Sequence, residues 1–208
     1  MRLFLSLILL SAIATTSSTA DGVSDVPYYR QYDNAERGGS ACNITSVAMM
    51  VDYFGIALDS ADKTRTPDKI YDRFGIKYNP EELAAIFNII AREANANVRD
   101  TFYERGTIEQ LRQELAQGNP VIVHGWFTKP GHIMVVTGFD GENYIVNDPA
   151  GRWNLKKWGA DSYDISVSGE GIRYPAEAFE YAINDNGTGD DLWLHVFEPF
   201  EPAAKQAD

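Results

Sequence analysis

The sequence contains one cysteine and three histidines among its 208 residues. A single cysteine cannot form an intramolecular disulfide, so Cys42 is either a buried apolar side chain or a reactive thiol. No H-E-x-x-H motif and no close pair of histidine and cysteine occurs, so the pattern does not indicate a zinc site. The motifs G-x-S-x-G and G-x-x-x-x-G-K-[ST] are also missing, which argues against a serine hydrolase and a P-loop protein.

Basic residues are few, with 18 Lys and Arg against 30 Asp and Glu, and the net charge is −12. This charge argues against nucleic acid or an anionic membrane surface as a partner.

Long apolar runs are also missing, apart from one at the N-terminus. The segment "MRLFLSLILLSAIATTSSTA" has one basic residue, an apolar run over residues 3–14 and small residues ending at Ala20, as is typical of a secretory signal peptide. The run is shorter than the roughly 20 residues that span a bilayer. We therefore expect removal of residues 1–20, a mature N-terminus at Asp21, a periplasmic or secreted protein, and one domain over residues 21–208 without an integral membrane segment.

Five segments have the apolar spacing and the terminal residues of helices. Asn79 precedes a proline and two acidic residues, and Thr107 with Gln110 forms a capping box. Ser40 is predicted to cap the helix that carries Cys42. The predicted helices cover residues 40–55, 66–75, 79–90, 107–118 and 174–183.

Strands are predicted mainly in the second half of the chain, where β-branched and aromatic residues lie between Gly, Pro and Asp. The predicted strands cover residues 97–103, 120–127, 132–139, 143–147 and 192–199. Helices that precede antiparallel strands predict an α+β fold, with the helix of Cys42 packed against a C-terminal antiparallel sheet.

The predicted position of Cys42 is the first turn of its helix, where unpaired N–H groups and the helix dipole lower a thiol pKa. A nucleophilic cysteine also needs a base. His124 and His195 lie inside apolar strands, which favours structural roles. His132 follows Pro130-Gly131 at the start of a strand, where it can face a pocket, so it is the candidate base.

The stretch "HIMVVTGFDGENYIVNDP" is predicted to be a hairpin that turns at Asp140-Gly141. A two-residue loop would pair His132 with Pro149 and turn Asp148 to the opposite face. A three-residue loop over residues 139–141 would place His132 directly opposite Asp148, with Cβ atoms about 5 Å apart. The turn residues fit either loop. We predict the second register, in which Asp148 orients the imidazole of His132.

Acyl transfer also needs hydrogen-bond donors for a developing oxyanion. The backbone N–H of Cys42 is one candidate, and the side-chain amide of Gln31, in "VPYYRQYDN", is another. A glutamine in a polar loop is more often simply solvated.

Four blocks together resemble the bacteriocin-processing branch of the papain-like cysteine peptidases, whose best-known members cleave after double-glycine leaders. The blocks are "VPYYRQYDN" with Gln31, "ACNITSVAMMVDYFG" with Cys42, "GHIMVVTGFDG" with His132 and "NYIVNDPAG" with Asp148. The resemblance implies a papain-like fold in which Cys42 is the nucleophile, His132 the general base and acid, Asp148 its orienting partner and Gln31 an oxyanion donor.

Two features depart from the leader-processing relatives. Asn43 stands after the cysteine where those relatives usually have glycine, and the chain has no transporter segment. The sequence is therefore closer to a stand-alone, exported branch of the family.

We expect an exported thiol hydrolase, a cysteine peptidase that acts on a peptide or isopeptide amide of a peptide or protein substrate without a metal or organic cofactor. Acyl transfer or deamidation by the same residues is an alternative. A binding module that keeps the fold without activity is another.

Overall fold

The computed structural model describes residues 25–159, 161 and 163–200, so the predicted signal peptide lies outside the described residues. The described helices are η1 (Gln31–Asp33), α1 (Cys42–Tyr53), α2 (Thr66–Phe74), α3 (Pro80–Glu93), α4 (Ile108–Ala116) and α5 (Ala176–Ile183). The strands are β1 (Val98–Gly106), β2 (Val121–Gly125), β3 (His132–Phe139), β4 (Asn143–Asn147), β5 (Arg152–Trp153), β6 (Tyr163–Asp164), β7 (Ile172–Pro175) and β8 (Leu192–Pro199).

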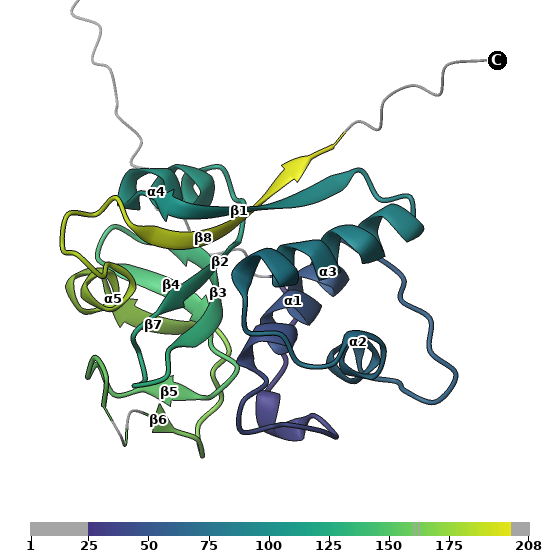
Figure 1. The fold of residues 1–208 in the computed structure, drawn as a ribbon. Coiled ribbons are helices and arrows are strands. Elements are labelled where there is room, and N and C mark those ends of the chain that lie inside the picture. Colours follow the sequence, from purple (N-terminus) through teal and green to yellow (C-terminus); the bar gives the residue numbers. More distant parts are fainter. Residues whose placement is uncertain (1–24, 160, 162, 201–208) are drawn as a thin grey trace, which may run out of the picture.

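Six of these strands form an antiparallel sheet in the order β1-β8-β2-β3-β4-β7, and β5 pairs with β6 in a small second sheet. Helices α1, α2 and α3 lie together on one side of the large sheet, and α4 and α5 lie on the other side (Figure 1). None of the described helices is long and apolar enough to cross a membrane. The α+β prediction, with the helix of Cys42 packed on an antiparallel sheet, is confirmed.

The two faces of the sheet form two separate hydrophobic clusters because side chains alternate along each strand. On β2 and β3, Ile122, Ile133 and Val135 pack with α1 and α3. Val123 and Met134, one position along, pack with α4 and α5. The sheet is therefore covered on both faces, and the start of α1 is held against β3.

The predicted helix starts at Asn79 and Thr107 are confirmed. The side chain of Asn79 accepts a hydrogen bond from the Glu82 N–H, and Thr107 accepts one from the Gln110 N–H. The predicted Ser40 cap is wrong. Ala41 occupies the cap position of α1, and its methyl side chain cannot accept a hydrogen bond. The Ser40 hydroxyl instead donates to the carbonyl of Arg37 at 3.5 Å.

The predicted hairpin register is wrong. Phe139 pairs with Tyr144, and the ladder shifts by one residue between Val136 and Gly138. The turn is displaced because Asp140 accepts hydrogen bonds from two backbone N–H groups that follow it, at 3.0 and 2.7 Å. Asp148 lies just beyond the end of β4 and is not a ladder partner of His132.

Three short strands were not predicted. β5 and β6 have two residues each, too few to show a hydrophobic period. β7 includes Tyr174 and Pro175, which were assigned to the start of the last helix. That helix begins at Ala176, two residues later than the predicted start at Tyr174.

Gly169 passes against the backbone of Asp148, whose N–H donates to the Gly169 carbonyl at 2.8 Å. A Cβ atom on Gly169 would lie 1.8 Å from the carbonyl oxygen of Asp148 and 3.0 Å from that of Gly151. Both obstacles are backbone, so the strain could be relieved only by moving the segment that carries Asp148.

We expect Gly169→Ala to lower the free energy of unfolding by about 3 kcal/mol or more, a fall in Tm of at least about 6 °C for a domain of this size. Thermal denaturation followed by circular dichroism measures this. Gly39→Ala is the matched control, because nothing lies within 4 Å of its added Cβ. An equal change in Tm for the two variants would contradict the role of close approach at Gly169.

Candidate active site

Cys42 is the first residue of α1, and its side chain is partly exposed. The backbone N–H groups of Asn43, on the same helix, and Ile133, on β3, act on its sulfur and lower the pKa of the thiol. Helix and strand are tied at this point because the Ser46 hydroxyl donates to the Ile133 carbonyl at 3.3 Å. The thiol therefore sits where the helical part of the chain meets the sheet.

His132 begins β3, directly after Gly131, whose φ of +88° allows the tight approach from the preceding loop. Its Nε2 atom lies 2.8 Å from Oδ1 of Asp148. Its side chain also makes a hydrogen bond with Cys42. Since Nε2 is engaged by the carboxylate, Nδ1 is the nitrogen that faces the sulfur.

Asp148 is completely buried, and both carboxylate oxygens are satisfied. Oδ1 accepts from His132 and from the Ala150 N–H at 3.0 Å, and Oδ2 accepts from the Tyr174 hydroxyl at 3.0 Å. Burial and the charge of Asp148 both raise the pKa of Tyr174, so the phenol keeps its proton and acts as the donor. This shell fixes the carboxylate that holds the imidazole.

The thiol and the imidazole shift each other's pKa in opposite directions. Burial raises the pKa of Cys42, but the charge of His132 and the hydrogen bonds from His132, Ile133 and Asn43 together bring it below its usual value. Burial lowers the pKa of His132, but Asp148 and Cys42 outweigh it and raise that pKa to about 10. The two groups therefore favour the thiolate–imidazolium form of the pair over the neutral form.

Gln31, the first residue of η1, is buried and lines the same pocket as Cys42. Its backbone N–H donates to the Pro149 carbonyl at 2.9 Å, which joins it to the segment after Asp148. Its Nε2 donates to the Gly38 carbonyl at 2.8 Å. An amide nitrogen has two hydrogens, so one N–H remains for a ligand.

Asn43, the residue that departs from the leader-processing pattern, has a structural contact. Its side chain is buried and donates to the carbonyl of Lys77. It thereby ties the start of α1 to the segment before α3.

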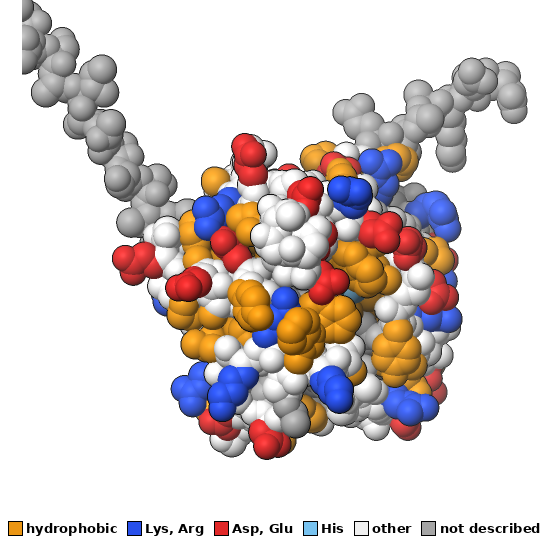
Figure 2. Space-filling view, turned by 60° about the vertical axis from the view of Figure 1, so that its left-hand side comes forward, with side chains coloured by type: hydrophobic (Ala, Val, Ile, Leu, Met, Phe, Trp, Pro, Cys, Tyr) orange, Lys and Arg blue, Asp and Glu red, His pale blue; other side chains and the backbone are white. Residues whose placement is uncertain are grey.

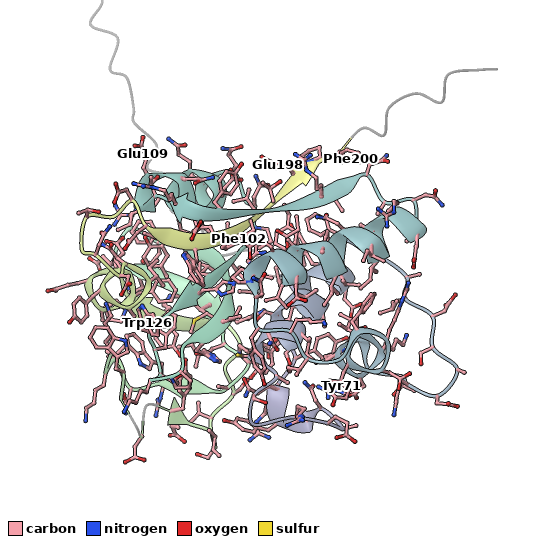
Figure 3. All side chains as sticks on the ribbon, in the orientation of Figure 1. Tyr71, Phe102, Glu109, Trp126, Glu198 and Phe200 are labelled. Atoms are coloured by element: carbon pink, nitrogen blue, oxygen red, sulfur yellow. The ribbon has the colours of Figure 1, made fainter. Side chains whose placement is uncertain are left out.

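A pocket of about 970 Å³ contains Gln31, Cys42 and His132 in its wall. Four exposed aromatic side chains also line it: Tyr32, Tyr78, Trp126 and Trp193. Trp126 lies beside α5 (Figure 3), and its backbone N–H donates to the Ala182 carbonyl at 2.8 Å. The face turned forward in Figure 2 shows hydrophobic side chains gathered between charged ones, a surface suited to a peptide with apolar side chains.

Several neighbours of the site gave no recognisable signal in the sequence. Tyr174 and Gly169 contact Asp148 from more than twenty residues away. Tyr163 packs its ring edge to face with that of His132, with centroids 5.0 Å apart. An aromatic residue or a glycine in a loop has many other uses, so only the fold assigns these positions.

Metal binding has no support in the described part of the chain, where no group of three or more His, Cys, Asp or Glu side chains is arranged to hold an ion. What the site provides instead is a polarised thiol, an imidazole bonded to a carboxylate and an amide donor around one pocket. This set of groups suits nucleophilic attack on a carbonyl.

The sequence profile of the Peptidase_C39 like family matches residues 23–180. The chain therefore belongs to this family. A search of curated proteins finds no match to the chain.

Solved structures that resemble the chain include the following two. One is a putative C39-like peptidase from Bacillus anthracis, with a TM-score of 0.55 and 19% identity over 86% of this chain and 98% of that one. The other is a double glycine motif protease from an AMS/PCAT transporter in complex with the leader peptide, with a TM-score of 0.52 and 21% identity over 86% and 94%. They confirm the papain-like fold, and family and fold together support a cysteine peptidase.

We expect His132→Ala to lower the rate at which iodoacetamide alkylates Cys42 at pH 7 by at least about tenfold. The substitution removes the charge and hydrogen bond that favour the thiolate, whereas burial remains, so the thiol pKa rises, and one pKa unit changes the thiolate fraction about tenfold. Mass spectrometry of samples alkylated between pH 5 and pH 10 measures the midpoint, which is the pH at which the alkylation rate reaches half of its maximum. In wild type it should lie below that of glutathione alkylated in parallel. A midpoint that His132→Ala leaves unchanged would contradict the coupling.

Proposed function

We propose that this protein is an exported cysteine peptidase that hydrolyses a peptide or isopeptide amide through an acyl-enzyme. The observation that carries the proposal is the arrangement of His132, bonded through Nε2 to Asp148 at 2.8 Å and through its other side to Cys42. A thiol, a base and a group that orients the base are the parts that nucleophilic catalysis requires.

In the acylation step the thiolate of Cys42 attacks the substrate carbonyl carbon and forms a tetrahedral intermediate. The imidazolium of His132 then gives its Nδ1 proton to the leaving nitrogen, and the C–N bond breaks. The amine leaves, and the acyl group stays on sulfur as a thioester. Asp148 keeps Nε2 protonated and the ring oriented throughout.

In the deacylation step His132, now neutral, takes a proton from a water molecule as that water attacks the thioester. The C–S bond breaks, the carboxylic acid product leaves, and the proton returns the thiolate–imidazolium pair to its starting state. No redox change occurs and no cofactor is consumed.

The negative charge on the tetrahedral intermediate needs donors on the side away from His132. The backbone N–H of Cys42 and the free N–H of Gln31 are the proposed pair. Gln31 is suited to this role because its bond to Gly38 holds the amide in one orientation before substrate arrives.

A peptide is the proposed substrate class. The pocket is large and rimmed by aromatic side chains, which suits an extended chain with apolar side chains. One structural neighbour is described in complex with a leader peptide, and the family is one of peptidases.

A library of tetrapeptidyl aminomethylcoumarins, including members that end in two glycines, tests the activity. We expect Cys42→Ala to abolish release of the fluorophore. His132→Ala should lower kcat/KM about 10²- to 10⁴-fold, and Gln31→Ala about 10²- to 10³-fold, the usual effect of one lost oxyanion donor.

Two results would contradict the proposal. Release of the fluorophore by Cys42→Ala would remove the nucleophile. If wild-type protein cleaves no peptide in the library, the result contradicts the proposed hydrolysis. A product in which an added amine, rather than water, takes the acyl group would replace hydrolysis by acyl transfer.

Export is proposed from the signal-like segment over residues 1–20. Expression in a bacterial host should give a periplasmic or secreted product whose first residue is Asp21, as read by mass spectrometry of the intact protein. Ala20→Leu should block this cleavage, since signal peptidase requires a small residue there. An unprocessed wild-type chain in the cytoplasm would contradict export.

A further inference from the structure

A second chain of hydrogen-bonded acid and imidazole groups runs across the large sheet. Asp100 on β1, His195 on β8 and His124 on β2 come from three neighbouring strands. The Nδ1 atom of His195 lies 2.9 and 3.1 Å from the two carboxylate oxygens of Asp100. Its Nε2 atom lies 2.9 Å from Nε2 of His124.

The inner end of this chain is sealed in the core, and the outer end reaches the pocket. Asp100 is 2% exposed and His195 is 0% exposed, whereas His124 is partly exposed and lines the same pocket as Cys42. Phe102 packs against both imidazoles, with centroids 5.1 and 6.1 Å away, and projects near the middle of the molecule (Figure 3).

The strand register places His124 close to the thiol. His124 pairs with Ile133 across β2 and β3, and the next pair is Gly125 with His132. Ile133 is the residue whose backbone N–H contacts the Cys42 sulfur. Paired residues on antiparallel strands lie about 5 Å apart, so a peptide whose carbonyl is at Cys42 passes within one or two residues of His124.

The hydrogen-bond geometry sets the tautomer of His124 when both rings are neutral. A carboxylate only accepts, so Nδ1 of His195 carries a hydrogen. With one proton on each ring, Nε2 of His195 is an acceptor, and the hydrogen between the two rings belongs to His124. Its Nδ1 atom is then a bare acceptor. In the described part of the chain no group donates to that atom.

A purely structural role explains the hydrogen-bonded group of Asp100, His195 and His124 poorly. Burying a carboxylate with an imidazole carries a large desolvation penalty that apolar side chains avoid. Burial lowers the pKa of His124 well below its ordinary value, and the charge of the nearby His132 adds to the effect. His124 therefore stays neutral and can accept a hydrogen bond near the imidazolium of His132.

We propose that His124 is a substrate-binding residue whose Nδ1 accepts a hydrogen bond from a backbone N–H of the bound peptide, with His195 and Asp100 as positioning residues that fix its tautomer. The proposal rests on the proposed peptidase function. It adds a polar anchor that lies on the sheet side of the pocket, outside the group formed by Cys42, His132, Asp148 and Gln31.

The first test compares two substitutions of His124, with the most rapidly cleaved tetrapeptidyl aminomethylcoumarin as the probe. The Gln amide extends as far as Nε2 and can keep the bond to His195, but it leaves nothing at the position of Nδ1. The Asn amide extends only as far as Nδ1 and can supply an acceptor there. We expect His124→Gln to raise KM about 3- to 10-fold, the effect of one neutral hydrogen bond, with a smaller change in kcat. His124→Asn should recover part of the loss.

The second test identifies the group on the substrate. Each backbone N–H of the same peptide is replaced in turn by N–CH₃. In wild type, methylation at one position should raise KM relative to the unmethylated peptide. In His124→Gln the same methylation should leave KM unchanged, because this variant lacks the acceptor at the position of Nδ1. A methylation penalty of equal size in both proteins at every position would overturn the proposal.

The third test reads the tautomers without any substrate. The protein has three histidines, so a ¹⁵N imidazole spectrum contains three ring systems, which single substitutions assign. At pH 8 we expect protons on Nε2 of His124 and Nδ1 of His195. Asp100→Asn should mix the tautomers of both rings and raise KM, whereas Asp72→Asn, at an exposed position of α2, should do neither. A proton on Nδ1 of His124 in wild type would overturn the proposal.

The outcomes separate this proposal from the one on which it rests. If the wild-type protein cleaves no peptide, the peptidase function fails. If it cleaves the probe and His124→Gln does so with the same KM, the peptidase function stands and the role of His124 fails.

Discussion

The hydrogen bond between His132 and Asp148 depends on a carboxylate that is completely buried. Such a charge is tolerated only where its lone pairs are filled, and here His132, Ala150 and Tyr174 fill them. The backbone of Asp148 also binds Gly169 and the hydroxyl of Tyr28. Contacts to this one residue thus bring together segments that range from Tyr28 to Tyr174 along the chain.

The helical part and the sheet contribute different halves of the site. The helical part supplies the thiol at the start of α1, with Gln31 just before it in the chain, and the sheet supplies the imidazole and its carboxylate. In one hydrophobic cluster α1 and α3 pack on one face of the sheet, and in the other α4 and α5 pack on the opposite face. The reactive atoms therefore lie at the seam between the helical part and the sheet, where small shifts alter their separation. Bonds across the seam, such as Ser46 to Ile133, limit those shifts.

Local signals in the sequence were sufficient for most helix and strand positions, because caps such as Asn79 and Thr107 act within one turn. The hairpin register was not predictable, because it depends on the side-chain bonds of Asp140 and on an irregularity between Val136 and Gly138. His195 was correctly placed in an apolar strand, but nothing local connects it to Asp100, 95 residues earlier. Contacts of this kind follow from strand order, which the sequence pattern leaves open.

The lowered pKa of Cys42 has a consequence for the chain before it folds. Two of the groups that lower it, His132 and Ile133, are about ninety residues away and reach the sulfur only when α1 has docked on β3. In an unfolded chain the thiol keeps an ordinary pKa of about 8.5 and is mostly protonated near neutral pH. The one cysteine is thus weakly reactive while the unfolded chain is exposed to oxidants and other thiols. It becomes a nucleophile only when the folded structure surrounds it.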